Sequence, residues 1–159
     1  MNLKFTLAYD GSLFQGSQKQ PNGMTVEDKL LKAFKKINIE TNIVLSGRTD
    51  KEVHATGQIF NCVVPDFWQD FFKLKDILNK NLPSSIKILR IQKVKDDFHS
   101  RFHAKKRVYR YLITTKPTTP FNNKFITHIK NVDEELLQKA IKDERYEDSK
   151  EIDYRIFNC

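Results

Sequence analysis

Residues 43–64 read IVLSGRTDKEVHATGQIFNCVV, and this stretch decides the fold because two apolar runs flank one polar segment. The first run, 43–45, predicts a short strand. The second, 58–64, predicts a buried strand that is apolar on both faces. The segment between them, 46–57, breaks the periodicity and has the composition of a loop. Two strands joined by this polar loop predict a hairpin-like pair.

On each side of this pair the sequence predicts one helix and one strand. Before it, residues 3–7 alternate as in a half-buried strand, and an apolar stripe at helical spacing follows the N-cap Thr25 to about residue 38. After it, a helix is expected over 70–82, closed by Pro83, and a strand over 86–94. The order β-α-β-β-α-β predicts an α+β, ferredoxin-like antiparallel sheet with both helices on one face.

The rest of the chain predicts the start of a second, incomplete α/β half. A strand is expected over 108–115 and a helix over 133–142, while 143–153 is charged and is predicted to be featureless. We therefore expect two domains. Residues 1–105 form the N-terminal ferredoxin-like domain that carries the polar loop, and 106–159 begin the second half.

Charge is distributed unevenly along the 159 residues, whose formal net charge is +8. Residues 1–130 hold 23 basic and 11 acidic side chains, whereas 131–159 hold 5 and 9. The excess of basic side chains in residues 1–130 favours a polyanionic partner. No segment has the length and apolarity of a membrane span and no signal-peptide core begins the chain, so we expect a soluble, cytoplasmic protein. The spacing of the cysteines and histidines favours neither a disulfide framework nor a metal site.

The stretch 87–116 is the most basic part of the chain, with ten basic and two acidic side chains. It is interleaved with Phe98, Phe102, Tyr109 and Tyr111, so cations for phosphates lie close in sequence to rings that can stack on bases. This pattern favours nucleic-acid binding over a solvated charged face. Tyr109 and Tyr111 share one face of the expected strand, where either base stacking or strand packing would suit them.

The polar loop places the carboxylate of Asp50 two positions from the guanidinium of Arg48. A nearby cation favours an ionised carboxylate, which can act as a nucleophile or a base. The same spacing is typical of a surface turn in which Asp50 accepts hydrogen bonds from the backbone and pairs with Arg48. Spacing alone leaves both interpretations open.

Several motifs resemble the TruA-type tRNA pseudouridine synthases. The most specific is GRTD at 47–50, followed by VHA at 53–55 and GQ at 57–58; YDGS at 9–12, FHxRF at 98–102 and YRY at 109–111 add to it. The resemblance covers residues 3 to about 142. It implies isomerisation of uridine to pseudouridine in the anticodon stem-loop of tRNA, at nucleotides 38, 39 or 40. It also implies a cytoplasmic homodimer that needs no cofactor and no metal.

The resemblance also implies roles for single residues. Asp50 matches the catalytic aspartate, which either attacks as a nucleophile or takes a proton from the sugar. Arg48 matches the arginine that pairs with it and helps displace the target nucleotide, and Tyr109 matches the tyrosine that packs against the uracil. Thr49 and His54 are expected to contact the substrate. The basic residues expected to contact RNA are Arg101, Lys105, Lys106, Arg107 and Arg110.

Two residues and the chain length depart from the family pattern. Glu52 stands where the family usually has Gly, so the loop is strained if that position requires φ > 0. Ser17 stands where many members have Trp. The family chain is typically far longer, and its second half completes the cleft. The alternative functions are therefore a non-catalytic RNA-binding module or an inactive fragment of such an enzyme.

Overall fold

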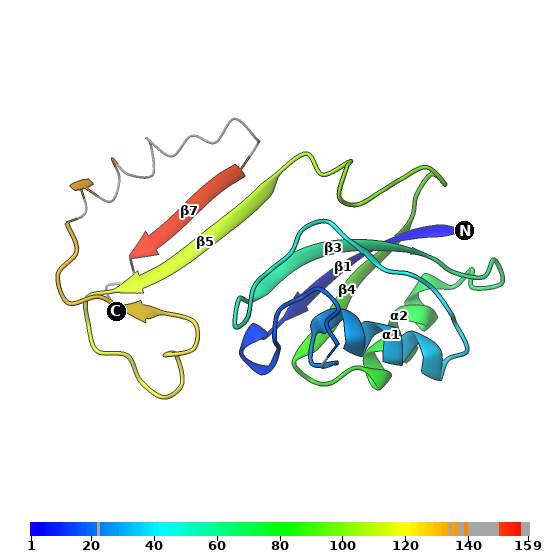
Figure 1. Cartoon of the computed structure of the whole chain (residues 1–159), viewed down its shortest axis with the longest axis horizontal. Helices are drawn as coiled ribbons and strands as arrows, with labels where there is room; N and C mark the ends of the chain where they lie inside the picture. The colour runs from blue at the N-terminus through cyan, green and yellow to red at the C-terminus, as the bar shows by residue number, and fades with distance from the viewer. Residues whose placement is uncertain (22, 134, 137–138, 140–149, 157–159) are drawn as a thin grey trace. The chain divides into compact units, whose positions relative to one another are not determined.

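The computed structural model describes residues 1–21, 23–133, 135–136 and 139, together with the backbone of 150–156. The chain divides into two compact units, Met1–Ala104 and Lys105–Cys159. Each unit has a sheet of its own, with four strands in the first and three in the second (Figure 1). The two units are described separately below.

The first unit has the predicted β-α-β-β-α-β order. Its elements are β1 (Asn2–Tyr9), α1 (Val26–Lys36), β2 (Val44–Leu45), β3 (Ala55–Val63), α2 (Phe71–Asn81) and β4 (Ile86–Lys93), with a 3-10 turn at Gly11–Leu13. The strands lie in the order β2-β3-β1-β4, and every neighbouring pair is antiparallel. Both helices cover one face of the sheet (Figure 1). The ferredoxin-like prediction is therefore confirmed.

The third strand differs from its prediction in extent and in burial. It begins at Ala55 rather than at residue 58, and Thr56, Gly57 and Val63 are exposed. Thr56 and Gly57 belong to the part of β3 that the sequence predicts to be loop. Within the predicted range 58–64, burial on both faces is wrong at Val63, because the helices cover only one face of the sheet. Pairing with β1 is also irregular, since a bulge shifts the register between Leu7 and Tyr9.

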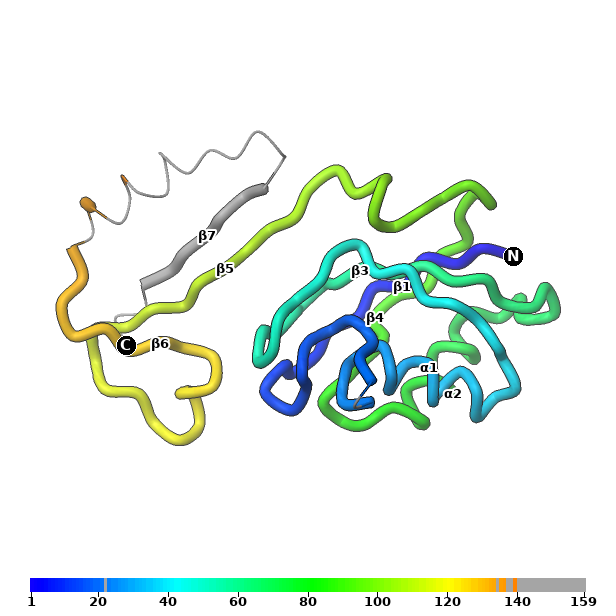
Figure 2. The backbone as a smooth tube through the Cα atoms, viewed as in Figure 1, coloured from blue at the N-terminus to red at the C-terminus, as the bar shows by residue number. Residues whose placement is uncertain are grey.

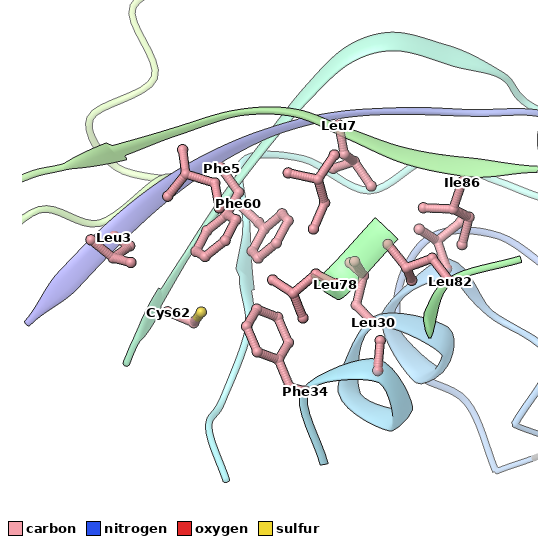
Figure 3. Packing of buried hydrophobic residues seen from close by; sticks show 14 of the residues in the cluster. Leu3, Phe5, Leu7, Leu30, Phe34, Phe60, Cys62, Leu78, Leu82 and Ile86 are labelled. Atoms are coloured by element: carbon pink, nitrogen blue, oxygen red, sulfur yellow. The ribbon is translucent and has the colours of Figure 1, made fainter. Parts of the chain in front are cut away.

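The core lies between the sheet and the helices. Alternate side chains of β1 are fully buried, as its period-2 pattern predicts. Phe5 of β1 stacks on Phe60 of β3 with ring centroids 4.5 Å apart, and it meets Phe34 of α1 edge-on at 5.7 Å. Figure 3 shows these rings beside Cys62. Burial raises the pKa of the Cys62 thiol to about 12, so it stays protonated at neutral pH and packs as a small apolar group.

Both helices of the first unit begin at capping residues. At α1, Thr25 and Asp28 form a reciprocal capping box, in which each side chain accepts a hydrogen bond from the other's backbone N–H at 3.2 Å. Asp70 caps α2 by accepting from the Lys73 backbone N–H. Among the residues that the structure describes, no helix has the length and apolarity to cross a membrane.

The second unit contains a small parallel sheet. Its strands are β5 (Arg107–Thr114), β6 (Thr127–His128) and β7 (Lys150–Ile156), in the order β6-β5-β7, and Figure 1 shows β5 beside β7. The prediction that 143–153 is featureless is wrong from residue 150 onward. Charged residues alternate there with Ile152, Tyr154 and Ile156, so the high charge conceals a period-2 pattern. Most of the helix predicted over 133–142 lies outside the described residues.

Candidate active site

The Asp50 loop, residues 46–54, joins β2 to β3 and is closed at its base by Gln58. The amide of Gln58 donates to the Gly47 carbonyl at 2.6 Å and accepts from the Ser46 hydroxyl at 3.2 Å. The backbone N–H of Ser46 donates to Ile59 O at 2.8 Å. These bonds satisfy backbone groups that a loop of this kind would otherwise leave to water. The loop therefore leaves the sheet with a fixed direction.

A second anchor holds the residue that immediately precedes Asp50. Ser17 is fully buried. Its backbone N–H donates to Thr49 O at 3.0 Å, and its hydroxyl accepts from the Thr49 N–H at 2.8 Å. The Thr49 hydroxyl in turn lies 2.8 Å from the hydroxyl of Tyr9, the last residue of β1. Burial raises the pKa of the Tyr9 phenol, so the hydroxyl keeps its proton.

Two glycines let the neighbouring segment approach the loop closely. A Cβ at Gly11 would lie 2.0 Å from Val53 O, which is shorter than any permitted van der Waals distance. Gly16 has a φ of +103°, and its Cβ would lie 3.0 Å from Thr49 O. The segment from Gly11 to Ser17 therefore packs backbone to backbone against the Asp50 loop.

His54 anchors the far end of the loop. Its Nδ1 lies 3.1 Å from the backbone N of Gly11 and 3.2 Å from Oδ1 of Asp10. In a neutral ring this atom accepts from the Gly11 N–H, and in a protonated ring it donates to Asp10. Thr49 and His54 thus position the loop in the structure. Their contact with a substrate remains a prediction.

Asp50 and Arg48 lie at the surface of the loop. The Arg48 Nε is 3.2 Å from Oδ1 of Asp50, and the side chains are 64% and 80% exposed. Solvent screening makes an ion pair of this kind weak. The Asp50 carboxylate can therefore separate from Arg48 at little cost, while hydrogen bonds hold the loop at Thr49 and His54.

Glu52 occupies a strained position in the turn that follows Asp50. The Val53 N–H donates to Asp50 O at 3.3 Å, and Glu52, the third residue of this turn, has a φ of 68°. Type II turns require positive φ at this position and favour glycine there. The strain anticipated from the glutamate at this position is present in the backbone.

Glu52→Gly should raise the free energy of unfolding by about 1 kcal/mol. The left-handed conformation costs a residue with a Cβ roughly 1–2 kcal/mol, and the added freedom of glycine in the unfolded chain offsets part of the gain. Urea unfolding measures the difference. Glu52→Ala is the control because it removes the same carboxylate but keeps Cβ. Equal stabilisation by both variants would show that the charge, and not the backbone strain, is responsible.

Ser17→Ala should lower the free energy of unfolding by about 1–3 kcal/mol, because it leaves the Thr49 N–H without the hydroxyl that accepts from it in a buried place. Hydrogen exchange at the Thr49 amide should become faster in the same variant. Ser12→Ala is the control, since Ser12 donates its hydroxyl to Asp10 at 2.6 Å but is only half-buried. If the two variants lose the same stability, the buried anchor at Ser17 has no special role.

The remaining predicted residues are distributed over both units. Tyr109 and Tyr111 lie two positions apart on β5 of the second unit, and both are exposed. The predicted RNA contacts are exposed except for half-buried Arg107; they are Arg101 in the first unit and Lys105, Lys106, Arg107 and Arg110 in the second. Within the described part of the chain, no group of three or more His, Cys, Asp or Glu side chains could hold a metal ion.

Sequence reasoning missed the residues that hold the loop. Ser17 was marked only by its departure from the tryptophan found in many family members, and Tyr9 only as part of a motif. Gln58 was likewise noted only within the Gly57-Gln58 pair. No local pattern connects these residues with the loop, because the contacts of Ser17 and Tyr9 join positions 32 and 40 residues apart.

Comparison with known proteins agrees with the fold and the loop. A family model described as tRNA pseudouridine synthase matches residues 6–103, which include the whole Asp50 loop. The chain belongs to the tRNA pseudouridine synthase family.

Individual relatives match over most of this chain. The protein named tRNA pseudouridine synthase A of Wolinella succinogenes is 38% identical over 136 residues, which are 86% of this chain and 54% of that protein. The protein of the same name from Streptococcus agalactiae is 36% identical over 88% of this chain and 55% of its own length. The protein of that name from Helicobacter pylori is 39% identical over 87% of this chain and 56% of its own length. The chain thus spans little more than half the length of these curated relatives.

Proposed function

We propose that the protein isomerises uridine to pseudouridine in the anticodon stem-loop of tRNA, at one or more of nucleotides 38, 39 and 40. The observation that carries the proposal is the GRTD loop. It presents an exposed Asp50 while both of its ends are fixed to the sheet and to the Gly11–Ser17 segment. The match of residues 6–103 to the family model and the names of the relatives support the same activity.

The reaction rearranges the bonds of one nucleotide. The N1–C1′ bond breaks, the uracil turns over, C5 bonds to C1′, the C5 proton is lost and N1 gains a proton. Atoms and electrons balance within the substrate and water, so we propose that no cofactor or metal takes part. Asp50 supplies the carboxylate, as a nucleophile or as a base toward the sugar. Arg48 releases Asp50 when the nucleotide enters and helps to displace that nucleotide from its stack.

The rest of the predicted site is part of the same proposal. Tyr109 packs against the uracil, and Thr49 and His54 contact the substrate from the loop that they help to hold. Residues 1–105 are the catalytic domain, and 106–159 begin the second half. The active form is a homodimer in the cytoplasm, where tRNA is available. Phosphate contacts are assigned to Arg101, Lys105, Lys106, Arg107 and Arg110.

Primer extension after carbodiimide treatment of an unmodified tRNA transcript tests the activity. Incubation with the protein should produce a stop one nucleotide 3′ of each modified uridine among 38 to 40, and a transcript with cytidine at these nucleotides should give none. The alternative is a non-catalytic RNA-binding module, which the exposed basic and aromatic residues between positions 101 and 111 would also suit. Binding of the transcript without any stop would support that alternative against the proposed activity.

A further inference from the structure

A cluster of stacked rings lies at residues 98–103 of the first unit. The rings of His99 and Phe102 stack with centroids 4.2 Å apart at 23°, and those of Phe98 and His103 stack at 5.6 Å and 20°. The His103 N–H donates to His99 O at 2.9 Å, and the His99 N–H donates to Nδ1 of His103 at 3.0 Å. We call Phe98, His99, Phe102 and His103 the ring cluster. Its Phe102 is 78% exposed.

Buried amides of the sheet hold the ring cluster in place. Oδ1 of Asn61 accepts from the Ser100 N–H at 2.8 Å, and Nδ2 of Asn2 donates to Phe98 O at 2.8 Å. The two asparagine side chains also bond to each other at 3.0 Å. Asn2, Asn61 and Ser100 are buried. The backbone that carries the rings is therefore held in place without a ligand, which lowers the entropic cost of binding.

Three basic side chains and one carboxylate lie beside the ring cluster. Arg101 lies within the segment and is exposed. Lys93 and Lys95 line a hollow of about 650 Å³ together with Val94, Asp97, Phe98 and His103. Exposed flat rings beside cations are the combination that binds unpaired nucleotides, since the rings stack on bases and the cations contact phosphates. A base inside a duplex has both faces covered by its neighbours, so the cluster suits an unpaired base.

The ring cluster is well separated from the Asp50 loop. It is held at Asn2, the first residue of β1, whereas the loop is held at Tyr9, the last residue of the same strand. Seven steps along a strand span roughly 23 Å at about 3.3 Å per residue. Figure 2 shows β1 extending between these two regions. A nucleotide at the ring cluster is therefore a different one from the nucleotide at Asp50.

We propose that the ring cluster is a second RNA contact, which stacks on one unpaired base of the substrate while Arg101 contacts a neighbouring phosphate. The inference rests on the proposed function, because it takes RNA as the ligand, and it deepens that function. The substrate presents an unstacked base at the ring cluster in addition to the nucleotide that reacts at Asp50.

Binding of RNA to Phe102 variants tests this site. The probes are a fluorescently labelled 12-nucleotide single-stranded RNA and a blunt duplex of the same length. Phe102→Ala should weaken binding of the single strand about tenfold and leave duplex binding within about twofold. Phe102→Trp should restore single-strand binding. The slope of log K against log salt should stay unchanged in Phe102→Ala and fall by about one in Arg101→Gln.

Phe72→Ala is a matched control. Phe72 on α2 is also 78% exposed, and the Lys75 ammonium lies 5.5 Å from its ring centroid, but it is not part of the ring cluster. The affinity of Phe72→Ala for the single-stranded RNA should equal that of the unmodified protein. Equal weakening by Phe72→Ala and Phe102→Ala would overturn the inference. So would unchanged RNA affinity of Phe102→Ala with an altered oligomeric state in sedimentation, which would make the cluster a protein contact.

The same experiments separate this inference from the proposed function. Single-strand binding that depends on Phe102, without pseudouridine formation on tRNA, would support the ring cluster and contradict the proposed activity. Pseudouridine formation together with RNA binding that does not depend on Phe102 would support the proposed activity and contradict the ring cluster as an RNA contact.

Discussion

Asp50→Asn is expected to lower pseudouridine formation on unmodified tRNA by more than about a thousandfold, because it removes the only carboxylate proposed to act on the nucleotide. The amide has nearly the same shape but is neither a competent nucleophile nor a base. Fold and tRNA affinity should be nearly unchanged, since the loop is held through Gly47, Thr49 and His54 while the Asp50 side chain is exposed. Primer extension, urea unfolding and filter binding measure the three properties.

Glu52→Gln is the matched control for this prediction. It neutralises the carboxylate two positions away on the same loop, where the Glu52 side chain is also exposed and pairs with Lys51 at 3.4 Å. Its activity should be close to that of the unmodified protein. A similar loss of activity in both variants would point to the net charge of the loop. A lower unfolding midpoint for Asp50→Asn would instead make Asp50 a structural residue.

The second large effect is expected at Gly11. Gly11→Ala should lower the free energy of unfolding by about 3 kcal/mol or more, because the new Cβ would lie 2.0 Å from Val53 O and 2.4 Å from Val53 C. These are backbone atoms, so no side-chain rotation relieves the contact. The loop has to move away from the end of β1, and turnover should fall together with stability.

Gly57→Ala makes the same chemical change where nothing lies within 4 Å of the added Cβ. It should alter the free energy of unfolding by less than about 0.5 kcal/mol. Thermal or urea unfolding of the two variants side by side measures the contrast. If Gly11→Ala unfolds like Gly57→Ala, the close approach of the Gly11 segment to the Asp50 loop does not exist in solution.

The first unit could be predicted from sequence because its signals are local. The alternation in β1 and the capping box at Thr25 each involve residues a few positions apart, and the order of elements then limits the sheet to few topologies. In the second unit the strand expected over 108–115 is present as β5, but its two neighbours gave weaker signals. β6 is only two residues long, and the apolar positions of β7 are embedded in charge. Their parallel pairing with β5 depends on contacts that no local pattern reports.

The residues of the candidate site also fall into those that a local pattern identifies and those that only tertiary contacts reveal. Arg48 and Asp50 are two positions apart, so their motif identified them together, and the backbone strain at Glu52 follows from one residue type at one position. The support that Ser17 and Tyr9 give to Thr49 depends on tertiary contacts. Close packing at Gly11 could have been suspected from its place after β1. The sequence does not indicate that Gly11 approaches the carbonyl of Val53.

The bulge between Leu7 and Tyr9 links the register of the sheet to the shape of the loop. Side chains of a strand alternate between its two faces, so pairing of β1 with β3 one residue out of register would turn Tyr9 to the opposite face. Thr49 would then lose its hydroxyl partner. A misregistered chain would consequently form a sheet but would leave the Asp50 loop without this contact. An ordered loop therefore indicates that β1 and β3 have paired in the native register.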